Sequence, residues 1–253
     1  MTENTSKKID GDRRQPSFGR YPHEGIIDLP NNTVSLTHLE GNNYSYARQS
    51  TGGETVKKTI CATTKNVSVE ISPLLPIHTP SYKTDFFFLR FTEPIYITQN
   101  ATAQVLVPLP IEVGVFLIDD VQEGMIDCFS CDPLNSRFAL YGTPEDGILC
   151  KYARTMPASS TPFMHAQFKI EITNELEEPA TISKVVFPAT DHDLHYHKNN
   201  VVMDGLVATV KNRLGLHVIE MVQKTTTNVG GWQTALRNIR KTDYKFSMER
   251  GFS

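Results

Sequence analysis

The sequence predicts an all-β fold, a β-sandwich-like arrangement of two packed antiparallel halves with one short C-terminal helix. Val, Ile, Thr, Phe, Tyr and Trp make up 84 of the 253 residues, whereas Ala, the strongest helix former, occurs 12 times. Short apolar runs recur about every 8 to 12 residues with turn residues between them, which is typical of sandwiches and barrels. No repeat of fixed period occurs in the sequence, so propellers and solenoids are not indicated.

The first 20 residues are expected to form a disordered tail, because they are polar and have no hydrophobic periodicity. An N-terminal β half is expected over residues 21–124. Its strands are predicted at Ile26–Leu29, Thr33–Leu39, Tyr44–Arg48, Thr55–Ala62, Val67–Ile71, Phe86–Phe91, Ile95–Thr98, Ala103–Val107 and Ile111–Ile118.

Burial of these strands follows from their patterns. Val67–Ile71 alternates apolar and polar residues, which predicts a half-buried strand. Phe86–Leu89 and Val113–Ile118 are nearly continuous apolar runs, so strands covered on both faces are expected there. The prolines of Pro73–Lys83 predict a loop between them.

A C-terminal β half is expected over residues 125–253. Arg137–Tyr141 and Ile148–Arg154 are predicted to form a hairpin around a Pro- and Gly-containing turn, with Cys150 facing the core. Trp232–Ile239 has the i, i+3, i+4, i+7 apolar spacing of a short amphipathic helix. The other expected strands are Met125–Phe129, His165–Thr173, Thr181–Phe187, Leu194–His197, Val201–Val210 and His217–Val222.

Several segments together carry a resemblance to a known family. The central ones are Pro110–Phe116, Phe138–Gly142 and Gly147–Tyr152, and the flanking ones are Ser72–Pro76, Phe91–Ile95, Ser183–Pro188 and Phe246–Gly251. These segments resemble the domain-of-unknown-function family 432 (DUF432). The resemblance covers about residues 18 to 252. It implies a mainly archaeal, intracellular family without an agreed biochemical activity, and it supplies no catalytic residues to carry over.

Charge and composition disfavour several classes of function. The formal net charge of −3 makes nucleic acid an unlikely partner. No apolar run reaches the roughly 18 to 20 residues of a spanning helix, so membrane insertion is not expected. The N-terminus has no apolar stretch of the kind that a secretory signal needs, which predicts a cytoplasmic protein with reduced cysteines.

The segment from Asp191 to His197 is the best candidate for a metal site. His195 and His197 share one face of a predicted strand, with Cα atoms about 6.6 Å apart, close enough for both imidazoles to bind one zinc or iron ion. His192 is a third candidate, although it points to the other face of a regular strand. A further ligand would have to come from elsewhere, such as His165 or His217. The alternative is a polar strand end on the surface.

Two other groups of side chains have residue types that could bind a metal ion or carry out redox chemistry. Cys128 and Cys131 have the spacing of a zinc-binding or redox pair, but the sequence contains no second such pair, and ordinary packing is the favoured interpretation. Asp119, Asp120, Glu123 and Asp127 could offer oxygen ligands to a divalent cation, yet their spacing fits no EF-hand and favours a solvated turn. No phosphate-binding loop, dinucleotide fingerprint, nucleophile elbow or zinc-protease motif occurs.

The sequence therefore predicts a protein that binds an unidentified protein or small molecule, without catalytic activity and without a bound cofactor. One alternative is a cupin-like metal-dependent enzyme that uses His195 and His197. A second alternative is a carbohydrate-binding sandwich, which is weakened because the single tryptophan, Trp232, is expected to anchor the helix. The sequence leaves the oligomeric state open.

Overall fold

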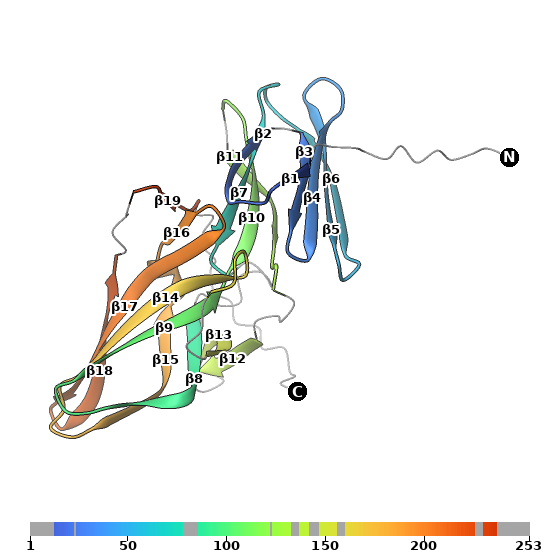
Figure 1. Ribbon diagram of the computed structural model, residues 1–253. Coiled ribbons are helices and arrows are strands. Elements are labelled where there is room, and N and C mark those ends of the chain that lie inside the picture. Colours follow the sequence, from blue (N-terminus) through green and yellow to red (C-terminus); the bar gives the residue numbers. More distant parts are fainter. Residues whose placement is uncertain are drawn as a thin grey trace. The chain divides into compact units, whose positions relative to one another are not determined.

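The computed structural model has an all-β fold, as the composition and spacing predict (Figure 1). It describes residues 13–22, 24–77, 86–121, 123–132, 137–141, 147–155, 160–225 and 230–236. Within these ranges the only helical element is one 3-10 turn, η1 (Ala189–Asp191). In the same part of the chain, no helix has the length and apolar character needed to cross a membrane.

The chain forms two compact units, each built from two segments. The first unit comprises Met1–Ile71 and Val115–Asp127, and the second comprises Ser72–Gly114 and Cys128–Ser253. The division into contiguous halves at residue 124 stays a prediction.

The first unit contains a five-stranded sheet with the order β1-β3-β4-β5-β6. These strands are β1 (Arg13–Arg14), β3 (Gly25–Leu29), β4 (Asn32–His38), β5 (Asn43–Ser50) and β6 (Thr55–Cys61). Burial alternates along β4 and β5, and Val34, Leu36 and Tyr46 lie on the buried face. This is the half-buried pattern that alternating apolar residues predict.

A four-stranded sheet has the order β11-β10-β7-β2. Its strands are β2 (Gly19–Pro22), β7 (Ser68–Leu74), β10 (Glu112–Ile118) and β11 (Glu123–Phe129). The continuous apolar run in β10 is buried on both faces, as predicted. Pro73 lies within β7 and is buried, so the predicted loop begins later than expected; residues 78–85 lie outside the described residues.

The predicted tail differs from the structure over its last residues. Arg13 and Arg14 pair in parallel with β3, and β2 pairs with β7. The Phe18 side chain is only 4% exposed. These residues are therefore part of the packed first unit, and residues 1–12 lie outside the described residues.

The second unit contains two further sheets. One has the order β12-β13-β8-β15, made from β8 (Phe86–Ile97), β12 (Arg137–Tyr141), β13 (Ile148–Thr155) and β15 (Ala180–Pro188). The other has the order β19-β16-β17-β14-β9, with β18 paired to β17; its strands are β9 (Thr102–Pro110), β14 (His165–Asn174), β16 (Leu194–His197), β17 (Asn200–Arg213), β18 (Leu216–Lys224) and β19 (Gln233–Thr234).

Aromatic side chains join these two sheets inside the second unit. The Phe187 ring on β15 stacks on Phe168 of β14, with ring centroids 4.9 Å apart, and on Phe87 of β8, with centroids 5.5 Å apart. All three side chains are at most 1% exposed. Stacked aromatic rings with this spacing contribute both buried area and a specific packing geometry.

Three expectations about strands and helices need correction. Phe87 and Leu89 are buried whereas Phe86 and Phe88 are only half-buried, so that run is not fully covered on both faces. The halves are not purely antiparallel, because β1 with β3, β13 with β8 and β14 with β17 pair in parallel. In the predicted helix, Gln233–Thr234 form strand β19 instead, and residues 237–239 lie outside the described residues. The sheet edge at β16 overrides the local helical spacing because it offers ladder hydrogen bonds.

The predicted hairpin is confirmed by the antiparallel pairing of β12 with β13. Its turn lies outside the described residues. Cys150 is fully buried, which confirms the predicted facing of that side chain.

Candidate functional site

The histidine segment forms β16, which lies between β17 and β19 in the fourth sheet (Figure 1). His195 is directly opposite Val202 on β17 and Thr234 on β19. His195 is 5% exposed, whereas His197 lies on the surface. The predicted strand therefore exists, but its two histidines have different environments.

A β-bulge in β17 brings an aspartate to this strand. Phe168 is opposite Met203 and Ile170 is opposite Leu206, so β17 has one more residue than β14 between these pairs. Gly205 belongs to the bulge, and a Cβ atom there would lie 3.0 Å from the backbone oxygen of Lys169. Glycine permits this close approach, and the bulge redirects the neighbouring side chain, Asp204.

The Asp204 carboxylate is completely buried and accepts hydrogen bonds on both oxygens. Oδ1 lies 3.1 Å from Nε2 of His195, and Oδ2 accepts from the backbone N–H of Asp193 at 3.1 Å and from Nε2 of Gln223 at 2.8 Å. An ionised carboxylate only accepts, so Nε2 of His195 carries a proton. In the neutral ring Nδ1 is then an acceptor, and it lies 3.4 Å from the Thr234 hydroxyl.

His192 belongs to the same cluster but faces the aromatic core. Its Nδ1 lies 2.9 Å from the backbone oxygen of Asp204, and its ring meets Phe168 and Phe187 edge-on at 5.6 and 5.2 Å. Burial lowers the pKa of His192 below its usual range, although the hydrogen bond to Asp204 opposes the shift. A neutral ring that donates from Nδ1 satisfies this position.

The structure does not bring the other proposed metal ligands to this segment. His165 lies 3.7 Å from Asp132, and His217 lies 3.5 Å from Glu178. The His197 ring lies against Trp232, with centroids 5.9 Å apart. Across the described ranges, no group of three or more His, Cys, Asp or Glu side chains is placed to hold a metal ion. A metal on His195 would have to displace the Thr234 hydroxyl or Asp204, so metal binding by His192, His195 and His197 stays a prediction.

The cysteines of the proposed pair are both reduced. Cys131 is buried, and the Cys128 thiol donates to the buried carboxylate of Glu112, with sulfur and oxygen 3.6 Å apart. This is the environment of packed thiols, as the sequence predicts.

The acidic group ends in Asp127, which takes part in a buried network of the first unit. Its Oδ2 accepts from Nε of Arg48 at 2.8 Å and from the Tyr46 hydroxyl at 2.7 Å. Asp119 and Asp120 instead accept from Thr63 and Asn66. Asp127 therefore neutralises Arg48, which is 4% exposed, rather than forming part of a cation site.

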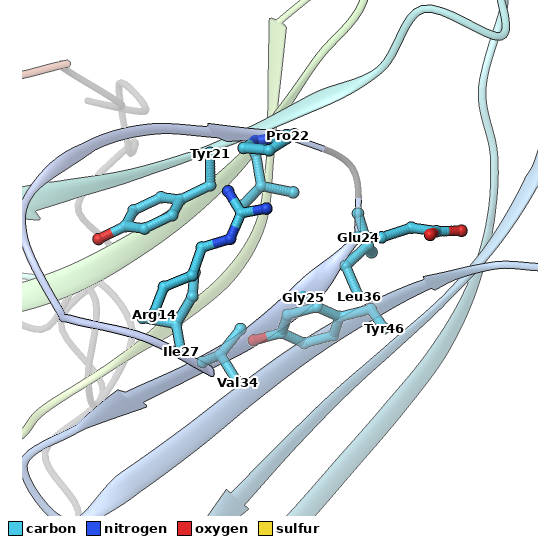
Figure 2. A pocket seen from close by; sticks show the side chains of 10 residues that line it. Arg14, Tyr21, Pro22, Glu24, Gly25, Ile27, Val34, Leu36 and Tyr46 are labelled. Atoms are coloured by element: carbon cyan, nitrogen blue, oxygen red, sulfur yellow. The ribbon is translucent and has the colours of Figure 1, made fainter. Parts of the chain in front are cut away.

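A pocket of the first unit is lined by side chains that include Arg14, Tyr21, Glu24 and Tyr46, which Figure 2 shows. Its volume is about 10 Å³, which is room for about one water molecule. A small-molecule site is not built here.

A much larger apolar cavity lies in the second unit, beside edge strand β15. Its volume is about 340 Å³, within the usual range of about 300 to 1,000 Å³ for ligand sites. Eight of the nine lining residues are apolar and one is Lys184: Ile172, Ile182, Lys184, Val185, Val186, Ala208, Val210, Ile219 and Met221.

The rim of this cavity carries positive charge and exposed apolar groups. Lys184 is directly opposite Arg90 on β8, and like charges in that register repel each other. Ile219 and Met221 on β18 are 51% and 43% exposed although they line the cavity. The lining therefore combines one cationic side chain with a partly exposed apolar wall.

Sequence reasoning missed Asp204, Thr234 and the cavity. The signal for Asp204 was present, because Asp-Gly interrupts the apolar run Val201–Val210 and a glycine inside a strand indicates a bulge. Thr234 was hidden by the helical spacing around it. The cavity combines residues from four strands, β14, β15, β17 and β18, and no single segment predicts it.

The comparisons with known proteins give a family and nothing finer. A family model described as "Protein of unknown function (DUF432)" matches residues 17–252. No curated protein and no solved structure matches. Since the matched residues cover nearly the whole sequence, the chain belongs to the DUF432 family, as the resemblance predicts.

Proposed function

We propose that the protein binds a small, elongated apolar molecule with an acidic head group in the cavity of the second unit. The observation that carries this proposal is the cavity itself, whose volume is about 340 Å³ and whose lining contains a single charged side chain. Ligand sites usually combine such a lining with a few polar groups that set the ligand's orientation.

The head group is assigned from the charge at the rim. Lys184 and Arg90 are neighbours across β15 and β8, so a carboxylate between them would be attracted by both cations. The apolar chain would contact Ile219 and Met221, which water otherwise reaches. A medium-chain fatty acid has this chemistry, and a sugar does not.

The experiment is a titration with a fluorescent medium-chain fatty acid, compared with the same chain ending in an alcohol. Met221→Glu places a charge in the cavity wall and is expected to weaken binding about 10-fold or more, because burying an ion among apolar groups is costly. Val222→Glu is the matched control: Val222 is the next residue on β18, is 66% exposed and does not line the cavity.

Lys184→Glu tests the head group separately. It is expected to weaken binding of the acid much more than binding of the alcohol, because only the acid is repelled. Absence of saturable binding, or equal effects of Met221→Glu and Val222→Glu, would overturn the proposal. Sedimentation velocity shows whether a second copy of the chain fills the cavity instead. A dimer that Met221→Glu dissociates would refute the proposal of a fatty-acid ligand.

A further inference from the structure

We infer that Asp204, His195 and Thr234 form a nucleophilic site that transfers acyl groups from activated esters to the Thr234 oxygen. This inference does not depend on ligand binding in the apolar cavity, because none of the three residues lines it. It rests on a chain of polar contacts from a buried carboxylate through an imidazole to a hydroxyl at the surface.

The order of burial along this chain is what the chemistry needs. The Asp204 side chain is 0% exposed and the His195 side chain 7% exposed, whereas Thr234 lies on the surface. The carboxylate fixes the proton of His195 on Nε2, so the lone pair on Nδ1 faces the hydroxyl. At 3.4 Å the contact between Nδ1 and Oγ1 is long, as such contacts often are before substrate binds.

Each partner is held in place by contacts of its own. The backbone N–H of Asp193 and the Gln223 amide orient the Asp204 carboxylate. On the other side, Ala235 donates its backbone N–H to the Leu194 oxygen at 2.8 Å, and Leu236 donates to the buried Ser72 hydroxyl at 3.1 Å. These two bonds anchor the residues immediately after Thr234. A hydroxyl and a base kept in register in this way are preorganised for proton transfer.

A second imidazole lies on the same face of β16 as His195. His197 follows His195 by two residues on the same face of β16, and its ring packs against Trp232. Gly231 has a φ of +96°, and a Cβ atom there would lie 3.8 Å from the His197 ring. An acyl group on Thr234 would therefore lie next to a ring N–H donor and an aromatic wall.

The reaction conserves atoms and charge. The Thr234 oxygen attacks the carbonyl carbon of the ester while its proton moves to Nδ1 of His195. The bond from that carbon to the leaving oxygen then breaks, and the proton passes from Nδ1 to the leaving group or to water. Water attacks the acyl-Thr234 ester with Nδ1 again taking the proton, which releases the carboxylic acid and restores the hydroxyl. Thr234 and His195 are the catalytic residues, and Asp204 is a positioning residue.

The test uses p-nitrophenyl acetate with the full-length protein. Release of p-nitrophenol and a mass increase of one acetyl group on the peptide that contains Thr234 are expected. Thr234→Ser should keep the reaction, whereas Thr234→Ala should abolish acetylation of that peptide. His195→Gln should slow acylation at least about 100-fold, the usual contribution of a general base. Thr181→Ala, at an exposed strand threonine of β15, is the matched control and should change nothing.

Asp204→Asn tests positioning. An amide can donate to Nε2 of His195 and so place the ring proton on Nδ1, where it blocks proton transfer from the hydroxyl. We expect a slower rate and a changed pH profile, whereas the Thr181→Ala control should keep the wild-type profile. Folding of every variant is checked by circular dichroism, and Thr234→Val serves if Thr234→Ala is unstable. Unchanged release of p-nitrophenol by Thr234→Ala and Thr234→Val, or acetyl groups found only on lysines or on His197, would overturn the inference.

Discussion

At the scale of single residues, the molecule is characterised by charges buried with their partners. Asp204 in the second unit and Arg48 in the first are 0% and 4% exposed. Each has hydrogen bonds to several groups, which offset the cost of removing a charge from water. Removing one partner therefore leaves the others unsatisfied, and the effect on stability exceeds the value of one hydrogen bond.

Asp204→Ala is expected to lower the free energy of unfolding by about 3 to 5 kcal/mol, because His195 and the Asp193 N–H lose their buried acceptor. Urea unfolding measures the change. Gln223→Ala removes an exposed donor to the same carboxylate and should cost about 1 kcal/mol or less. Equal losses of unfolding free energy in the two variants would contradict the claim that burial of the Asp204 carboxylate sets the size of the effect.

His192 makes stability depend on pH. Burial lowers its pKa in the folded protein, so below about pH 6.5 the unfolded chain binds a proton that the folded chain does not. Stability from this group is thus complete above that pH and is lost as the pH falls. Replacing His192 by Asn should flatten the slope of unfolding free energy against pH by up to about 1.4 kcal/mol per pH unit.

Two comparisons complete this pH experiment. Burial also lowers the pKa of His165, which Asp132 opposes, so His192→Asn is expected to remove part of the slope and not all of it. His197→Asn changes an exposed histidine and serves as the surface control. An identical slope in wild type and His192→Asn between about pH 7.5 and 5.5 would contradict the prediction.

At the scale of elements, irregularities in the strands position the polar groups. The bulge in β17 lies in the middle of a 14-residue strand that is otherwise regularly paired with β14. Asp204 directly precedes the bulge glycine, Gly205, and its carboxylate contacts His195 on β16. Strand β19 has only two residues, yet it closes the other side of β16.

Gly205→Ala tests the bulge. The added methyl group would lie 3.0 Å from the Lys169 backbone oxygen, so β14 and β17 would have to separate. We expect a loss of about 1 to 3 kcal/mol of stability, together with weaker contact between Asp204 and His195. The control is Gly124→Ala, at a strand glycine of β11 with no atom within 4 Å of the new Cβ. Thermal unfolding should show that its free energy of unfolding lies within about 1 kcal/mol of the wild-type value.

At the scale of the whole molecule, two units share one chain that passes between them three times. Each unit therefore depends on segments far apart in the sequence. The first unit also includes residues near the N-terminus, since β1 and β2 pair with β3 and β7.

Deleting residues 1–18 is expected to destabilise the first unit, because Phe18 is buried and β1 is lost. Loss of a buried Phe costs about 3 to 5 kcal/mol, which corresponds to a fall in Tm of roughly 6 to 12 °C for a chain of this size. Phe18→Ala alone should give most of that change. Deletion of residues 1–12 should leave Tm unchanged, since that polar stretch has little apolar surface to bury; a similar fall for both deletions would contradict this account.

The amino-acid sequence by itself determined the all-β class, the family and most strand positions. Alternating or continuous apolar residues at Val67–Ile71 and Val113–Ile118 carry that information locally, because side-chain direction alternates along any strand. Leu194–His197 was identified in the same way, with His195 and His197 on one face. Local periodicity is sufficient to predict a strand where the neighbouring strands do not alter the alternation of buried and exposed residues.

Only the tertiary structure decided which side chains from distant strands come into contact. Gln233–Thr234 lie within the helical spacing of Trp232–Ile239 but form strand β19, because the edge of β16 supplies hydrogen bonds that a short isolated helix cannot match. His195 contacts Asp204 through one ring nitrogen and Thr234 through the other, because strands distant in sequence pair on both sides of β16. The cavity beside Lys184 likewise forms between strands of different sheets. Such contacts depend on register and packing, which a one-dimensional pattern does not specify.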